Sequence, residues 1–259
     1  MSGLDGRSFT QDIHLPGTET ASIVPTPQLK QVADGVESLV SFGGVITLDG
    51  RPGLGKSAAA NLVGYAIDLQ KEMVAMPNRP RGKETTAHLY EALTGQRPRM
   101  RSITEYELLG DITDLLQGQQ VLLAIDEAQH LNSNAFRQLR YLHDRPDSKL
   151  VLILIGVGLE RHLISACPEL DNRVRQRVRF KRYARSDMVR FMQRYHPLFK
   201  NTSSDAFNVL LDAINGNLRS CSQVLAAALH DHGTNPERGL TKDEAHAVIS
   251  TIFGSNRGA

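Results

Sequence analysis

A glycine-rich turn between a predicted strand and a predicted helix constrains the fold of this chain more than any other feature. The apolar run Val45–Leu48 predicts a strand, and the alanine-rich segment Ser57–Leu69 predicts a helix. The turn from Gly50 to Ser57 has the pattern G-x-x-x-x-G-K-[ST]. In this context the backbone amides of the turn and the N-terminus of the helix form a cradle for phosphate groups.

The residue types in the turn point to a nucleoside triphosphate and a divalent cation. Lys56 has the length and charge to reach the β and γ phosphates, and the Ser57 hydroxyl is placed to coordinate Mg²⁺. We therefore expect ATP and Mg²⁺ as ligands. The expected nucleotide-binding residues of the turn are Gly50, Arg51, Pro52, Gly53, Leu54, Gly55, Lys56, Ser57 and Ala58.

Two adjacent carboxylates supply the other half of such a site. Asp126 and Glu127 follow the fully apolar run Val121–Ile125, which is typical of a strand buried on both faces. We expect Asp126 to share the Mg²⁺ with Ser57, and Glu127 to orient and deprotonate an attacking water. The alternative is that the two carboxylates only cap a helix.

Alternating strands and helices predict an α/β domain. Further strands are expected at Met73–Met76 and Leu150–Ile155, with helices at Lys83–Leu93, Thr104–Leu116 and Asn134–His143. This order is typical of a parallel sheet with helices on both faces. In the second of these helices we expect Tyr106, Leu109, Ile112 and either Leu115 or Leu116 on one face.

The last part of the chain predicts helices only. They are expected at Met188–Tyr195, Ser204–Ile214, Leu218–Asp231 and Lys242–Phe253. We therefore expect a flexible arm over residues 1–22, an α/β domain over 23–182 and a small all-helical domain over 183–259.

Composition and charge narrow the choice of partner and compartment. Two cysteines in 259 residues cannot build a disulfide framework, and no apolar run is long enough to span a bilayer, so we expect a cytoplasmic protein with no membrane partner. The net charge of +2 conceals basic segments at 77–101 (+4) and 172–194 (+8), which leaves −10 elsewhere. Such asymmetry indicates a polyanionic partner or a solvated basic face.

The motifs resemble those of the AAA+ ATPases. The run Ile125-Asp-Glu-Ala-Gln-His-Leu131, with Leu139-Arg-Tyr-Leu-His-Asp144 after it, resembles the transposition ATPases of the MuB, TnsC and TniB type, with the ExeA/GspA secretion ATPases nearby. The segment Ile23–Pro27 resembles the start of the MuB and TnsC proteins. The resemblance covers roughly residues 23–228 and implies an AAA+ P-loop fold with a helical lid.

The resemblance also implies roles for three arginines. The segment Leu170–Val178 resembles the one that carries a trans-acting arginine finger, with Arg173 and Arg177 as candidates one helical turn apart. Arg219 occupies the position of the lid arginine that contacts the γ-phosphate. Each of the three is otherwise a surface arginine. Val157 stands where the family often has a polar sensor, so fast hydrolysis is not expected.

A ring or helical filament of identical subunits on duplex DNA is the assembly that the resemblance implies. We expect sequence-tolerant contacts to the DNA phosphates, because the sequence contains no motif for reading bases. The candidate contact residues are Lys83, Thr85, Thr86, Arg97, Arg99 and Arg101. The alternative is that these six polar residues only keep a loop soluble.

The resulting functional prediction is an ATPase that assembles on duplex DNA and regulates transposition or target-site selection. Hydrolysis of ATP, slow and stimulated by assembly or by a partner such as a transposase, would disassemble the oligomer. Two alternatives remain at this point. One is an ATPase similar to helicase loaders or initiators, and the other is an ATP-switched scaffold or signalling assembly with little hydrolysis.

Overall fold

The computed structural model describes residues 18, 20–67, 70–77, 83–231 and 233–254, and these residues form two compact units. The sheet unit consists of Pro27–Pro52 and Lys56–Phe180. The helical unit consists of the described parts of Met1–Thr26 and Lys181–Ala259, together with Gly53–Gly55. Most of the predicted arm 1–22 lies outside the described residues, as do residues 78–82 of the first basic segment.

The sheet unit is built on five parallel strands in the order β2-β3-β4-β1-β5. The strands are β1 (Gly44–Gly50), β2 (Gln70–Ala75), β3 (Val121–Asp126), β4 (Val151–Gly156) and β5 (Val174–Phe180). In the register, Asp49 of β1 pairs with Gly156 of β4, and Ile125 of β3 pairs with Leu154 of β4. The carboxyl ends of β1, β3 and β4 are therefore level at one edge of the sheet.

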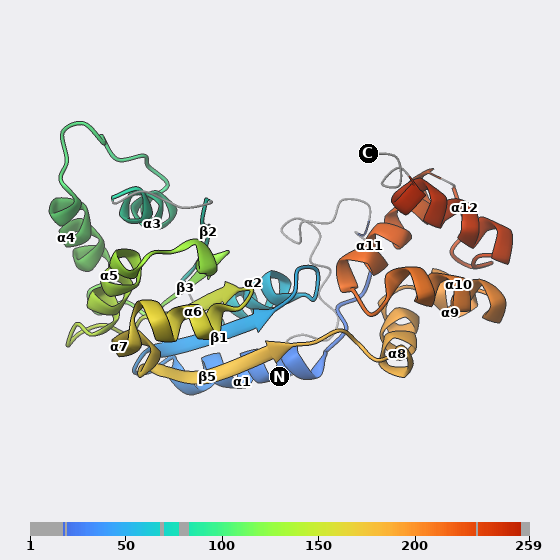
Figure 1. Ribbon diagram of the computed structural model, residues 1–259, viewed down its shortest axis with the longest axis horizontal. Coiled ribbons are helices and arrows are strands. Elements are labelled where there is room, and N and C mark those ends of the chain that lie inside the picture. The colour runs from blue at the N-terminus through green and yellow to red at the C-terminus, as the bar shows by residue number, and fades with distance from the viewer. Residues whose placement is uncertain (1–17, 19, 68–69, 78–82, 232, 255–259) are drawn as a thin grey trace. The chain divides into compact units, whose positions relative to one another are not determined.

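Helices cover both faces of this sheet, as the alternation of strands and helices predicts. One face packs against α1 (Pro27–Leu39) and α2 (Lys56–Ala66), and Figure 1 shows α1 running beside β5. The other face packs against the helices between β2 and β5. These are α3 (Glu84–Thr94), α4 (Glu105–Leu116), the short 3₁₀ helix η1 (Ala128–His130), α5 (Ser133–His143), α6 (Leu159–Ala166) and α7 (Pro168–Asp171).

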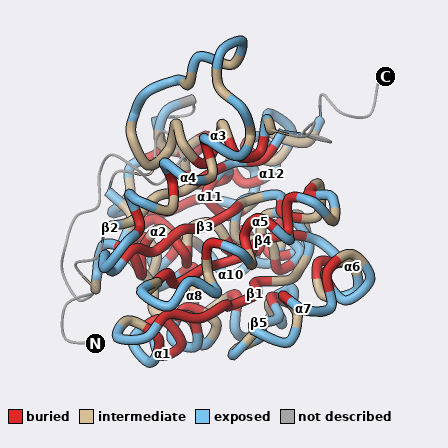
Figure 2. Tube along the Cα trace, turned by 90° about the vertical axis from the view of Figure 1, so that its left-hand side faces the viewer, coloured by how far each residue is buried: buried red, intermediate tan, exposed pale blue. Residues whose placement is uncertain are grey.

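The core of the sheet unit explains why the central strands are apolar without interruption. Leu123 and Leu152 point into a cluster with Phe136 and Leu139 of α5. On the opposite face, Ile46 of β1 lies so close to α1 that a Cβ on Gly35 would be 3.1 Å from its Cδ1. Strands buried on both faces have no solvent side that would favour polar residues. Figure 2 shows the resulting band of buried chain along β1, β3 and β4.

The helical unit holds a second core. Its elements are α8 (Arg185–Tyr195), α9 (Pro197–Asn201), α10 (Ser204–Ile214), α11 (Leu218–Ala226), the π-helical turn η2 (Ala227–Asp231) and α12 (Lys242–Phe253). Met192, Phe199, Leu210 and Val224 lie fully inside it. The predicted helix Leu218–Asp231 is thus present, but it widens into a π turn over its last five residues.

Local signals set several helix starts. Thr104 caps α4 through a capping box with Glu107, and Thr241 caps α12 in the same way with Glu244. The face predicted for α4 is confirmed at Ile112 and Leu116 and wrong at Tyr106. The buried residues of this helix are Leu108, Ile112 and Leu116, whereas the Tyr106 side chain is 85% exposed. The helix is rotated by about one residue from the predicted face, because Leu108 and Leu116 complete the buried row at helical spacing.

The segment after α7 corrects a second prediction. Residues 174–180 form strand β5 at the edge of the sheet, so Arg173 and Arg177 are not one helical turn apart. The alternation of exposed arginines with Val174, Val178 and Phe180 is the period of a strand. Charged side chains on an edge strand also discourage pairing with another sheet.

Candidate nucleotide site

The phosphate loop leaves β1 and enters α2 at the carboxyl edge of the sheet. Gly50 has a φ of 156°, and a Cβ there would lie 2.4 Å from the carbonyl oxygen of Phe180. Only glycine fits this close approach of two backbones. Lys56 opens α2, is 8% exposed, and donates from Nζ to the carbonyls of Gly50 (2.7 Å) and Arg51 (2.9 Å). The loop therefore folds around its own lysine.

Ser57 and Asp126 meet across the sheet although 69 positions separate them in the sequence. The Ser57 hydroxyl donates to Oδ2 of Asp126 at 2.5 Å, and the backbone N–H of Glu127 donates to Oδ1 of Asp126 at 2.8 Å. A hydroxyl and a carboxylate are the oxygen ligands that Mg²⁺ takes from proteins when phosphates supply others. These two residues fit the predicted cation site beside the buried Lys56.

Glu127 stands at the end of β3 in an unusual backbone conformation. Its φ of 55° is left-handed, and Asn215 is the only other non-glycine residue with positive φ among those described. A left-handed glutamate costs about 1–2 kcal/mol. Its side chain is exposed, and Oε2 accepts a hydrogen bond from Nε2 of Gln129 at 2.5 Å. A strained residue at the predicted site of water activation is typical of functional sites.

The loop between β4 and α6 is fixed by two side chains to which the sequence analysis gave no role. Asp49 of β1 accepts from the backbone N–H groups of Gly158 (2.9 Å) and Glu160 (3.4 Å), at the start of α6. Gln129 accepts from the N–H of Val157 at 3.2 Å. Gln129 lies within the quoted run Ile125–Leu131, two positions after Glu127, and Asp49 directly precedes the glycine turn. That adjacency was the only signal.

The two candidate arginine fingers are engaged within their own chain. Arg173 makes a two-pronged contact with Asp144, with its Nε at 3.0 Å from Oδ1 and its Nη2 at 3.1 Å from Oδ2. Arg177 pairs with Asp171 at 2.8 Å. Burial opposes ionisation of Asp144, but hydrogen bonds from His143 and Arg173 outweigh it and lower the pKa of Asp144. Neither arginine touches the Lys56 region in these contacts.

The lid candidate Arg219 lies in the first turn of α11 in the helical unit. Asn217 caps this helix by accepting from the N–H of Ser220, and the N–H of Arg219 donates to the carbonyl of Gly53 at 3.0 Å. Gly53 belongs to the same unit. The Arg219 side chain is exposed, and its role stays a prediction.

The six candidate DNA contacts fall into two groups. Arg97, Arg99 and Arg101 are exposed on the connection between α3 and α4, which Figures 1 and 2 show as a long exposed loop. The prediction for Thr85 and Thr86 needs correction. Both are buried in the first turn of α3, at 1% and 0% exposure, so their hydroxyls face the protein interior.

Lys83 supports the α3–α4 loop. Its Nζ donates to the carbonyls of Met100 (2.5 Å) and Ile103 (2.7 Å), which draws the end of the loop back to the start of α3. In this position the ammonium group satisfies backbone acceptors and is not presented to a phosphate. The sequence could not distinguish this lysine from the arginines near it, because the partners are 17 and 20 positions away.

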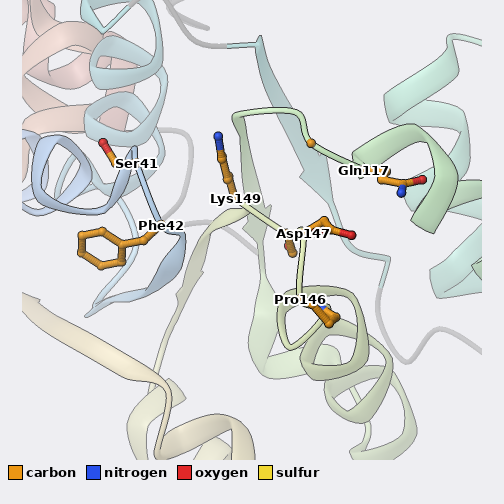
Figure 3. Close-up of a pocket in the computed structure, with 8 residues that line it drawn as sticks. Ser41, Phe42, Gln117, Pro146, Asp147 and Lys149 are labelled. Carbon is orange, nitrogen blue, oxygen red and sulfur yellow. The ribbon is translucent and has the colours of Figure 1, made fainter.

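A separate hollow of about 700 Å³ lies at the other end of the strands. Its wall comes from the turns before β1 and β4 and from the end of α4, as Figure 3 shows. Phe42, 63% exposed, and Lys149 border it. Since the phosphate loop is at the carboxyl ends of the strands, this hollow is not the nucleotide site.

The remaining side chains give fewer functional leads. Cys167 and Cys221 are both buried and form no disulfide bond. The described residues contain no group of three or more His, Cys, Asp or Glu side chains arranged to hold a metal ion. None of the helices described is long and apolar enough to cross a membrane.

Comparison with known proteins supports the fold. Residues 41–164 match the family described as an AAA domain. Cdc6p from Pyrobaculum aerophilum has a TM-score of 0.68 at 18% identity, covering 95% of this chain and 70% of that one. The ORC1 protein of Aeropyrum pernix in complex with DNA has a TM-score of 0.66 at 14% identity, covering 94% and 68%.

A third solved structure is similar in the same way. The Aeropyrum pernix ORC2 protein, in its ADPNP and ADP complexes, has a TM-score of 0.64 at 13% identity and covers 90% of this chain and 67% of that one. No curated protein matches the sequence. Residues 41–164 therefore resemble an AAA domain, and the chain has the AAA+ P-loop fold of the ORC and Cdc6 structures.

Proposed function

We propose that this protein is an ATP-hydrolysing AAA+ regulator that assembles on duplex DNA and acts in transposition or target-site selection. The observation that carries the ATPase part is the contact between Ser57 and Asp126 at 2.5 Å, with Glu127 next in the chain and Lys56 buried beside it. A lysine suited to bind phosphate, two candidate Mg²⁺ ligands and a candidate general base thus lie at one edge of the sheet, which supports the proposal.

The chemistry assigned to these residues is attack of water on the γ-phosphorus. Glu127 takes a proton from the water while the water oxygen forms a bond to phosphorus. The bond between that phosphorus and the leaving ADP oxygen breaks. Lys56 leaves the carbonyls of Gly50 and Arg51 for the phosphates. Mg²⁺ held by Ser57 and Asp126 would neutralise charge on the phosphates.

Contact with DNA rests on the α3–α4 loop. Arg97, Arg99 and Arg101 are exposed there, and the loop 95–103 has no acidic residue. Glu91 of α3 partly neutralises Arg97 through an ion pair at 2.8 Å. With so few contacts per subunit, we expect weak binding by one chain, and firm, salt-sensitive binding only when many subunits act together.

Assembly through an arginine of the neighbouring subunit extends the proposal. To act as an arginine finger, Arg173 must leave its partner Asp144, or Arg177 its partner Asp171, and contact the γ-phosphate bound by the neighbouring subunit. Such an exchange between two anionic partners would couple assembly to bound ATP, and hydrolysis would release it. The proposed client is a transposase or target-selection protein, as the resemblance to MuB, TnsC and TniB proteins implies.

A second candidate function is that of an initiator or helicase-loader ATPase. The similarity of fold to Cdc6p and to ORC1 in complex with DNA favours it. The identity to these proteins is 18% or less, which is informative about fold alone. The third possibility, a scaffold switched by ATP without turnover, differs from both in its rate of phosphate release.

Electron microscopy with and without duplex DNA and a slowly hydrolysed ATP analogue tests the assembly. We expect rings or filaments only when the analogue is present, more of them with DNA, and their loss on exchange into ADP. Particles that stay monomeric in every condition contradict the proposal. Co-purification with a transposase supports the transposition function, whereas co-purification with a replicative helicase favours the second candidate.

A further inference from the structure

Gln129 is the side chain that connects Glu127 to the neighbouring strand. Its Nε2 donates to Oε2 of Glu127 at 2.5 Å, and its Oε1 accepts from the backbone N–H of Val157, just past β4, at 3.2 Å. The carboxylate can only accept and the backbone N–H can only donate. The two partners therefore fix which end of the carboxamide faces which, and only a group with both functions can bridge them.

The surrounding backbone is shaped to admit this carboxamide. Gly156 ends β4, and a Cβ there would lie 2.5 Å from Oε1 of Gln129, so the carboxamide would have to move to make room for it. Ala128, between Glu127 and Gln129 in the chain, is fully buried and anchors η1 in the core. The absence of a side chain at Gly156 therefore leaves room for the carboxamide between Glu127 and the N–H of Val157.

The bridge leaves one carboxylate oxygen of Glu127 available. Among the described residues the hydrogen bond to Gln129 uses Oε2, and no hydrogen bond to Oε1 occurs. An exposed glutamate side chain otherwise samples several rotamers, and placing it within about 1 Å is worth up to about 10²-fold in rate. A restrained carboxylate with one oxygen open is suited to receive a proton from water.

We propose that Gln129 is a positioning residue, which orients Glu127 for hydrolysis by tying its carboxylate to the N–H of Val157. This inference rests on the proposed ATPase function and adds to it the residue that holds the general base in place. Gln129 acts through Glu127, and no contact with the nucleotide is assigned to it.

Three variants test the bridge. Gln129→Met keeps the length but removes both hydrogen bonds, and Gly156→Ala leaves Gln129 in the chain while displacing its carboxamide. Each is expected to lower kcat for ATP between tenfold and a hundredfold, with KM and the affinity for a fluorescent ATP analogue within twofold of wild type. Gln119→Met, an exposed glutamine before β3, is the matched control and should leave kcat unchanged.

Hydrogen exchange examines the contact without nucleotide. The amide of Val157 should exchange at least tenfold faster in Gln129→Met, whereas the amide of Gly158, bound to Asp49, should not change. Equal exchange of Val157 in both proteins overturns the bridge.

The kinetic outcomes distinguish the two proposals. If wild type hydrolyses ATP, Glu127→Gln does not, and Gln129→Met matches or exceeds wild type, then Gln129 does not position the base and the ATPase function stands. If wild type and Glu127→Gln are equally inactive under assembly conditions, the proposed ATPase function itself is wrong.

Discussion

The charged residues at the end of β3 and those along β5 have different kinds of partner. Asp126 and Glu127 accept hydrogen bonds from neutral donors, and neither forms an ion pair with a cation among the described residues. Along β5 and just before it, Arg173, Arg177 and Arg179 each pair with a carboxylate of the same unit.

That difference teaches how to interpret a run of charge. A carboxylate held by neutral donors keeps its full charge for a ligand, whereas an arginine already paired offers a ligand little unless the pair opens. The Arg179 guanidinium, for example, lowers the pKa of Glu160 by its hydrogen bond. Several arginines of the basic segment 172–194 are thus neutralised by carboxylates of the same chain. The formal charge of +8 therefore overstates the positive charge available to a polyanion.

The largest expected effect is at the end of β3. Glu127→Gln keeps the shape of the side chain but cannot accept a proton, so the rate of hydrolysis should fall by about 10²–10⁴. Nucleotide affinity should be retained, because Lys56 and the loop are untouched. Single-turnover phosphate release and analogue binding measure the two quantities, with Glu37→Gln on α1 as an exposed control. A variant as active as wild type would remove Glu127 from the reaction.

Arg173→Ala tests whether the arginine just before β5 acts on the nucleotide of a neighbouring subunit. If Arg173 is the trans-acting residue, hydrolysis by the assembled protein should fall about tenfold or more while the unassembled protein binds nucleotide normally. Arg175→Ala is the matched control, because Arg175 is exposed on β5, two positions after Arg173, and makes no ion pair among the described residues. If only stability changes, by at most about 1 kcal/mol, the pair with Asp144 is structural.

A smaller effect is expected from the α3–α4 loop. Replacing Arg97, Arg99 and Arg101 together by alanine should weaken duplex binding about tenfold near 0.1 M salt and reduce the slope of log K against log salt by about 2–3. The control removes the same charge elsewhere, from the exposed Arg182, Arg190 and Arg194 of the helical unit. Equal losses in the two triple variants would mean that net charge, and not the loop, governs binding.

The smallest expected effect is a pH dependence of the helical unit. His196 is 3% exposed, its Nδ1 accepts from the N–H of Leu198 at 3.1 Å, and burial lowers its pKa from 6.5. The unfolded chain therefore binds the proton more readily, so this contribution to stability is complete above about pH 6.5 and declines as the pH falls below it.

Thermal unfolding of wild type and His196→Asn at pH 7.5 and 5.5 measures this contribution. Asparagine caps a helix but does not titrate, so the variant should lose less stability between the two pH values than wild type loses. An equal loss in both proteins would assign the acid sensitivity to other groups.

The sequence by itself determined the elements whose signals are local. The glycine turn before α2, the uninterrupted apolar strands β3 and β4, and the caps Thr104 and Thr241 depend on residues within a few positions of one another. For the same reason the residues around Lys56 and Asp126 were found, since each is part of a short motif at a strand end.

Only the tertiary structure decided what depends on distant partners. Strand β5 is short and basic, and it exists because β1 offers it a parallel edge. The burial of Thr85 and Thr86, the anchoring of Lys83 and the bridge from Glu127 through Gln129 to Val157 likewise depend on distant or tertiary contacts. Hydrogen bonding and burial are properties of a neighbourhood, and a linear pattern contains only the part of that neighbourhood that is adjacent in the chain.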